Sequence, residues 1–229
     1  MGETVQIKQE QDYFDAYLAR PNGAAKAGIV VIQEIFGVND DIRATADWLA
    51  EQGYMALAPD LFWAQERNLA LNADDEADLQ KAFGLMTNYD ADAGVADLQS
   101  AIDYLRDAGC ARVGTIGFCL GGRMVYMAAC RTNGDAHSSY YGVGIQDMLG
   151  EADAITAPTL IHIAGADDFV PPEAQAAIAD GLAAHALVDV HIYDEQEHAF
   201  ARHSGMHYDA ASTELAHQRT LALFEKALT

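Results

Sequence analysis

One stretch of the sequence, residues 112–122 (RVGTIGFCLGG), restricts the fold more than any other. It begins with β-branched residues and continues into a Gly-x-Cys-x-Gly pattern centred on Cys119, and residues 123–129 then have the composition of a helix. This order predicts a strand, a sharp turn and a helix. The glycines two residues before and after Cys119 fit that prediction, because the apex of such a turn is strained and only small neighbours leave room for it.

The predicted turn gives Cys119 two alternative interpretations. The residue would stand at the carboxyl end of a strand and the amino end of a helix, where the helix dipole and free N–H groups favour a reactive thiolate. The alternative is a buried structural cysteine followed by a tight glycine turn. The choice depends on whether a base and a group that orients it follow in the chain.

Apolar runs and helical patterns alternate along the rest of the chain. Residues 28–32 are continuously apolar and residues 158–164 are largely apolar, as expected for strands covered by helices on both faces. The predicted strands cover residues 13–19, 28–32, 54–58, 112–118, 138–144, 158–164 and 188–193, and the predicted helices cover residues 40–52, 79–88, 95–109, 123–129, 172–186 and 211–228. We therefore expect a single α/β domain over residues 1–229, with a doubly wound, mostly parallel sheet and helices on both faces.

Composition excludes several classes of protein. Of the 229 residues, 51% are hydrophobic, which is enough for a full core, yet nothing predicts a membrane span or a secretory leader. The formal charge of -22 argues against nucleic acid and anionic membranes as partners. The cysteines Cys110, Cys119 and Cys130 lack the spacing of a disulfide framework or a zinc site, and they favour a reducing, cytoplasmic location.

Two acidic residues directly follow predicted strands. Glu34 comes after the strand at 28–32, at the edge of an open parallel sheet where ligands bind, although a solvated loop acid is the alternative. Asp60 follows the strand at 54–58, and here we prefer a structural role as a cap of neighbouring N–H groups.

Three polar residues of complementary chemistry each follow a predicted strand: Cys119, Asp167 and His198. Their chain order, nucleophile then acid then base, is that of the α/β-hydrolase scaffold. In this arrangement His198 takes the thiol proton and Asp167 fixes the imidazole tautomer. By analogy with the same scaffold, the backbone N–H groups of Leu120 and Ile35 would hold the developing oxyanion.

At this point the sequence resembles the dienelactone hydrolase, or carboxymethylenebutenolidase, family over nearly its whole length. The segments that carry the resemblance are Gln33–Gly37, Ala58–Leu61, Gly117–Gly122, Tyr140–Gly142, Asp167 with Phe169–Pro171, and His198 with Phe200.

The resemblance implies specific roles for individual residues. The family triad of Cys, Asp and His corresponds to Cys119, Asp167 and His198, and it selects Asp167 over the neighbouring Asp168. The family glutamate that matches Glu34 governs the protonation of the thiol before substrate arrives, so the resemblance implies a nucleophile that is activated by substrate binding.

The sequence also departs from the family pattern. Family enzymes that act on dienelactone hold its carboxylate with two arginines, of which Arg202 matches one. The other belongs to the predicted helix near residues 75–88, where the nearest basic residue is Lys81. Loss of one arginine weakens carboxylate binding by about 1–3 kcal/mol. The aromatic residues Phe36 and Tyr140 are further candidates for substrate contact.

Taken together, the sequence predicts a cofactor-free cysteine hydrolase of small carboxylic esters or lactones, acting through a thioacyl-enzyme. His203 and His207 follow His198, but the loop setting and the lack of a nearby cysteine disfavour a metal site. Alternatives are a thioesterase or other acyl hydrolase on the same site, or a non-catalytic, redox-sensing protein that uses Cys119. The expected partner is a small-molecule ester or lactone, and the sequence leaves the oligomeric state open, a monomer included.

Overall fold

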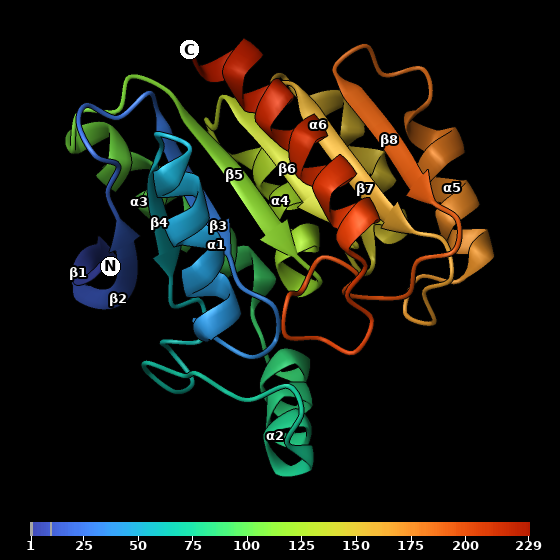
Figure 1. The fold of residues 1–229 in the computed structure, drawn as a ribbon, viewed down its shortest axis with the longest axis horizontal. Coiled ribbons are helices and arrows are strands. Elements are labelled where there is room, and N and C mark those ends of the chain that lie inside the picture. Colours follow the sequence, from blue (N-terminus) through green and yellow to red (C-terminus); the bar gives the residue numbers. More distant parts are fainter. Residues whose placement is uncertain (1, 10) are drawn as a thin grey trace.

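The computed structural model describes residues 2–9 and 11–229, and its eight strands form one sheet (Figure 1). The strands are β1 (Glu3–Gln9), β2 (Asp12–Ala19), β3 (Gly28–Ile32), β4 (Met55–Pro59), β5 (Val113–Phe118), β6 (Ala136–Tyr140), β7 (Thr159–Ala164) and β8 (Val188–Tyr193). Their order in space is β1-β2-β4-β3-β5-β6-β7-β8. Strand β2 is antiparallel to β1 and to β4, and all the other neighbouring pairs are parallel. The predicted mostly parallel sheet is therefore confirmed.

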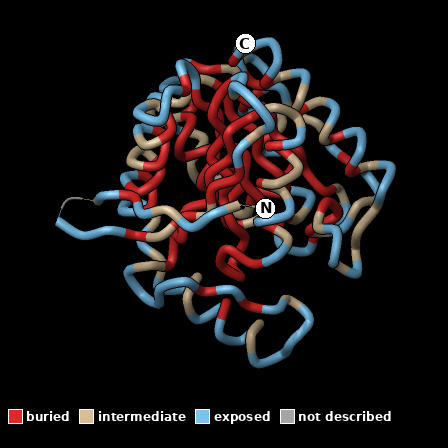
Figure 2. The backbone as a smooth tube through the Cα atoms, turned by 60° about the vertical axis from the view of Figure 1, so that its left-hand side comes forward, coloured by how far each residue is buried: buried red, intermediate tan, exposed pale blue. Residues whose placement is uncertain are grey.

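Helices cover both faces of this sheet. They are α1 (Asp40–Glu51), α2 (Glu76–Thr87), α3 (Ala91–Asp107), α4 (Leu120–Arg131), α5 (Pro172–Leu182) and α6 (Ala210–Leu228), together with a 3-10 helix over Ile145–Ala154. In Figure 1, α1 and α6 lie on the near face, while α3, α4 and α5 lie on the far face. Figure 2 shows the buried residues concentrated between these layers.

The differences from the predicted elements have local causes. Strand β1 was not expected, because residues 3–9 are mostly polar and Ile7 is the one buried residue among them. The 3-10 helix Ile145–Ala154 was not expected either. Helix α2 begins at Glu76 rather than at residue 79, because Asp75 caps it and acidic side chains in its first turn are favoured by the helix dipole.

The crossover pattern fixes where a ligand can bind. Strand β3 pairs in parallel with both β4 and β5, so the chain moves to one side of β3 and then returns to its other side. At such a reversal the helices diverge and leave a crevice at the carboxyl ends of the strands. In Figure 1, α2 and the loop that precedes α6 lie beyond this edge.

Two buried polar residues, Asp60 and His162, have structural roles. Asp60 accepts hydrogen bonds from the backbone N–H groups of Phe62 (3.1 Å) and Asn68 (2.6 Å), which confirms the predicted cap. His162 is fully buried inside β7, where its ring nitrogens contact the hydroxyl groups of Tyr193 (2.8 Å) and Thr220 (3.1 Å). A buried imidazole that is satisfied in this way belongs to the core.

A second buried imidazole, His137, occupies the centre of the sheet on β6. It is 0% exposed, and its Nδ1 lies 2.9 Å from the hydroxyl of Thr115 on the neighbouring strand β5. Burial lowers the pKa of His137 to about 4, because a charged imidazolium would lose its hydration there. The ring is therefore neutral at physiological pH.

Candidate active site

The turn between β5 and α4 has the strained geometry that its sequence predicts. Cys119 adopts φ 56° and ψ -116°, a positive φ that is rare outside glycine. A Cβ on Gly121 would lie 2.4 Å from the carbonyl oxygen of Ile32, and one on Gly117 would lie 2.3 Å from the carbonyl oxygen of Gly121. No side chain fits at either glycine, so the two residues allow α4 to approach β3 and hold Cys119 at the edge of the sheet.

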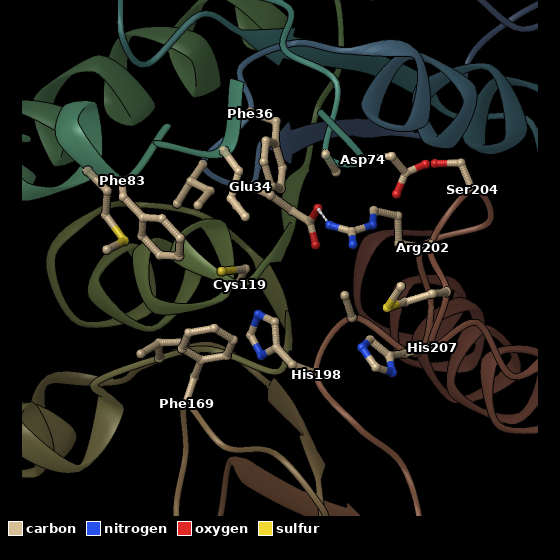
Figure 3. Close-up of a pocket in the computed structure, with 18 residues that line it drawn as sticks. Glu34, Phe36, Asp74, Phe83, Cys119, Phe169, His198, Arg202, Ser204 and His207 are labelled. Atoms are coloured by element: carbon tan, nitrogen blue, oxygen red, sulfur yellow. Dashed lines mark hydrogen bonds and ion pairs between the residues drawn. The ribbon is translucent and has the colours of Figure 1, made fainter. Parts of the chain in front are cut away.

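The imidazole of His198 is fixed by a buried carboxylate. Its Nδ1 lies 2.7 Å from Oδ2 of Asp167, and the two side chains are 15% and 0% exposed. The other oxygen of Asp167 accepts the backbone N–H of Phe169 at 2.8 Å. The neighbouring Asp168, in contrast, is exposed. With both carboxylate oxygens engaged, the ring has one orientation, and Figure 3 shows it beside Cys119.

Charges around His198 favour its protonated form. Burial by itself lowers the pKa of the imidazole, but the negative charges of Asp167 and of Cys119 as a thiolate raise it more, to about 10. The imidazole of His198 is therefore protonated at neutral pH and carries a positive charge at the edge of the cavity.

Two rings pack against His198. The rings of Tyr141 and Phe169 have their centroids 5.1 Å and 4.8 Å from that of the imidazole. Tyr140, which the sequence selected as a substrate contact, lies elsewhere: it is fully buried, and its hydroxyl contacts Thr220 at 2.8 Å. Tyr140, the last residue of β6, faces α6. Tyr141, with φ 39°, turns toward the site. Tyr141, and not Tyr140, is thus the tyrosine that packs on His198.

Glu34 and Arg202 form a buried ion pair next to Cys119. The distance from Nη1 of Arg202 to Oε2 of Glu34 is 3.0 Å, and the side chains are 14% and 5% exposed. The guanidinium also lies over the ring of Phe36, 5.5 Å from its centroid. Burial lowers the pKa of Arg202, but Glu34 raises it more, so the guanidinium keeps its charge. Gln33 supports the loop by accepting the backbone N–H of Leu61 at 3.1 Å.

The predicted oxyanion donors are Leu120, which follows Cys119 in the chain, and Ile35 in the loop after β3. Leu120 is the first residue of α4, so its backbone N–H has no acceptor within the helix. Ile35 follows β3, and its side chain contributes to the same pocket as Cys119 and His198.

These residues open into a cavity of about 770 Å³. Glu34, Cys119, His198 and Arg202 form its polar floor, and α2 and the loop before α6 form its walls. Its large apolar lining residues are Ile35, Phe36, Leu79, Phe83, Met86, Val143, Phe169 and Met206. A volume of this size accommodates a small organic substrate.

Other basic groups near the cavity are engaged or remote. Lys81, the nearest basic residue to the missing arginine position, contacts Glu66 at 2.7 Å and is not part of the cavity lining. His207 lines the cavity and pairs with Glu197 at 2.8 Å. His203 stacks on the ring of Tyr208. Within residues 2–9 and 11–229, no group of three or more His, Cys, Asp or Glu side chains is placed to hold a metal ion, and no helix has the length and apolar content to cross a membrane.

Comparisons with known proteins agree with this architecture. A family model described as the dienelactone hydrolase family matches residues 14–228. A putative carboxymethylenebutenolidase of Azospirillum brasilense is 41% identical over 219 residues, which are 94% of each chain. A carboxymethylenebutenolidase of Pseudomonas putida is 40% identical over 210 residues, or 91% of this chain and 89% of the relative.

A solved structure extends the similarity to three dimensions. The putative dienelactone hydrolase from Klebsiella pneumoniae subsp. pneumoniae matches with a TM-score of 0.87 and 28% identity, covering 98% of both chains. The sheet order and the turn at Cys119 define an α/β hydrolase. Because the family model covers nearly the whole chain, the protein belongs to the dienelactone hydrolase family, as its sequence predicted, and it is a hydrolase.

Sequence reasoning missed three features of the site. It did not anticipate that Arg202 pairs with Glu34, or that Tyr141 packs on the base in place of Tyr140. It also gave no weight to Asp74 and Met206, which line the cavity from loops with no recognisable motif. The pair of adjacent tyrosines was a usable signal, because two successive residues at the end of a strand face opposite sides of a sheet.

Proposed function

We propose that this protein hydrolyses small carboxylic esters or lactones with Cys119 as nucleophile, His198 as acid and base, and Asp167 as the group that orients the imidazole. The observation that carries the proposal is the buried contact of His198 with Asp167 in the same cavity as the strained Cys119. A binding pocket alone needs neither the base nor its orienting carboxylate.

In the first half-reaction the Cys119 thiolate attacks the carbonyl carbon, and the carbonyl oxygen becomes an oxyanion held by the N–H groups of Leu120 and Ile35. Collapse of this intermediate breaks the bond to the ester oxygen. The leaving alkoxide takes a proton from the His198 imidazolium, and a thioacyl-enzyme remains. With a lactone, the leaving oxygen stays attached to the acyl group as a hydroxyl.

In the second half-reaction water completes the hydrolysis. Acylation removes the negative charge of Cys119, which is one of the groups that raise the pKa of His198. The imidazole is then a better general base, and it takes a proton from water as the water attacks the thioester carbonyl. Expulsion of the Cys119 thiolate releases the acid and restores the imidazolium and thiolate pair.

Glu34 is proposed as the group that controls the protonation of Cys119. The ion pair with Arg202 holds its carboxylate at the cavity floor, beside the nucleophile. We expect Glu34→Gln to change the pH dependence of Cys119 alkylation by iodoacetamide, with a smaller effect on KM.

The test compares hydrolysis of p-nitrophenyl esters and of cis- and trans-dienelactone by wild type, Cys119→Ala, Cys119→Ser and His198→Ala. The proposal expects turnover to disappear in Cys119→Ala and His198→Ala. It also expects intact-protein mass spectrometry to detect an acyl adduct on wild type under rapid quenching. Cys130→Ala is the matched control, because this free cysteine lies on α4 away from the cavity.

Persistent turnover in Cys119→Ala would refute the proposed nucleophile. Activity toward thioesters and not toward oxygen esters would assign a thioesterase to the same site. If His198→Ala loses no function and peroxide modifies Cys119, a redox role takes the place of hydrolysis. The cysteines Cys110, Cys119 and Cys130 are free. A cytoplasmic location of the protein stays a prediction.

A further inference from the structure

The charged groups around the catalytic cavity are neutralised by partners of the protein itself. The guanidinium of Arg202 is paired with Glu34 at 3.0 Å, and the imidazole of His207 has Glu197 as its partner at 2.8 Å. Lys81 on α2 faces Glu66 instead of the cavity. Among the described lining residues, Arg202 is the single Lys or Arg side chain, and its charge is already balanced.

A further carboxylate stands at the cavity wall. Asp74 is exposed and lines the cavity just before α2, and the view in Figure 3 places it on the same side as Glu34 and Arg202. An anionic substrate entering this cavity would meet Asp74, and the one Lys or Arg among the described lining residues already has a carboxylate partner. The formal charge of -22 on the whole chain adds a long-range repulsion in the same direction.

Apolar side chains, in contrast, are gathered at the cavity. Phe83, Phe169 and Met206 all line it, and they are among the few large apolar residues that are exposed, at 37%, 53% and 83%. They come from α2, from the loop after β7 and from the loop before α6. Exposed apolar residues that converge on one cavity from three segments indicate an apolar ligand.

We propose that the substrate is an ester or lactone whose acyl group is uncharged and apolar, bound between Phe83, Phe169 and Met206, and that Asp74 selects against a carboxylate on that group. This inference rests on the proposed function. It predicts that this hydrolase disfavours anionic lactones even though it retains an arginine beside the nucleophile.

The first experiment uses two esters that differ in one group. The acyl chain of p-nitrophenyl hexanoate ends in a methyl group, and that of p-nitrophenyl hydrogen adipate ends in a carboxylate at the same distance. We expect kcat/KM to be at least about tenfold higher for the hexanoate at low ionic strength. We also expect added salt to narrow the difference, since it screens the repulsion. An adipate that is used as well as the hexanoate would overturn the inference.

Variants then test which residue causes the preference for the uncharged ester. We expect Asp74→Asn to raise the ratio of adipate to hexanoate turnover about threefold, and Met86→Arg on α2 to raise it about tenfold. The matched control is Asp107→Asn, which removes the same charge at the end of α3, before the amino end of β5. If all three variants change the ratio equally, the effect belongs to net charge and the assignment of Asp74 fails.

A second arm tests the apolar contacts. We expect hexanoate to exceed acetate in kcat/KM, and Met206→Ser to reduce that preference about threefold. The control is Leu215→Ser, which removes an exposed leucine from α6. If wild type shows no preference for the longer chain, the apolar site is refuted while ester hydrolysis stands. If no ester is hydrolysed, or Cys119→Ala stays active, the proposed function fails and the inference fails with it.

Discussion

Removal of Arg202 is expected to lower the stability of the fold. In Arg202→Met the carboxylate of Glu34 keeps its burial but loses its counter-charge at 3.0 Å. Oε1 of Glu34 is buried, and it has no hydrogen-bond partner among the described residues. The carboxylate therefore has little left to compensate its lost hydration.

The expected cost follows from this burial. Breaking a buried ion pair by removing one partner costs about 3–5 kcal/mol, because an uncompensated charge remains inside. For a chain of this size that corresponds to a melting temperature lower by roughly 6–20 °C. We expect Glu34→Gln combined with Arg202→Met to recover most of the loss, since the double variant buries no unpaired charge.

The assay is urea unfolding followed by circular dichroism at pH 7.5. Arg131→Met is the matched control, because Arg131 pairs with Glu151 and Asp92 at the surface, where the three side chains are 31%, 39% and 84% exposed. Pairs of this kind are worth about 0–1 kcal/mol. A deficit in Arg202→Met no larger than in Arg131→Met would refute the reasoning, as would a double variant no more stable than the single one.

Two further predictions concern glycine substitutions and the pH dependence of stability. Gly121→Ala should abolish activity and lower the yield of folded protein, since its Cβ would meet the carbonyl of Ile32, whereas Gly84→Ala, in open space on α2, should raise stability by about 0.5–1 kcal/mol. Circular dichroism and ester turnover of the two variants check this contrast. His137, whose pKa is lowered to about 4, stays neutral in the folded state while the unfolded chain binds a proton below about 6.5, so stability falls by up to about 3 kcal/mol as the pH falls through this window. Urea unfolding between pH 4 and 7.5 gives the free energy of unfolding at each pH, and this free energy should depend less on pH in His137→Gln than in wild type. An unchanged pH dependence would contradict the burial argument.

Much of the fold was predictable because its signals are local. A continuous apolar run such as residues 28–32 fits only a strand covered on both faces, and each such run became a strand of the parallel sheet. The turn at Cys119 was equally readable, because glycines at fixed offsets are a steric requirement of the turn itself. Strand β1 escaped notice because a half-exposed edge strand has no strong periodic pattern.

The sequence by itself determined the doubly wound architecture, the reactive turn and the residue types available for catalysis, since these depend on spacing within short segments. Only the tertiary structure decided which groups meet. Arg202 and Glu34 are 168 positions apart, and no local pattern shows that the arginine is paired with the glutamate. Pairing across such distances depends on the order of the strands in the sheet. That order brings the loop after β3, which carries Glu34, beside the loop before α6, which carries Arg202.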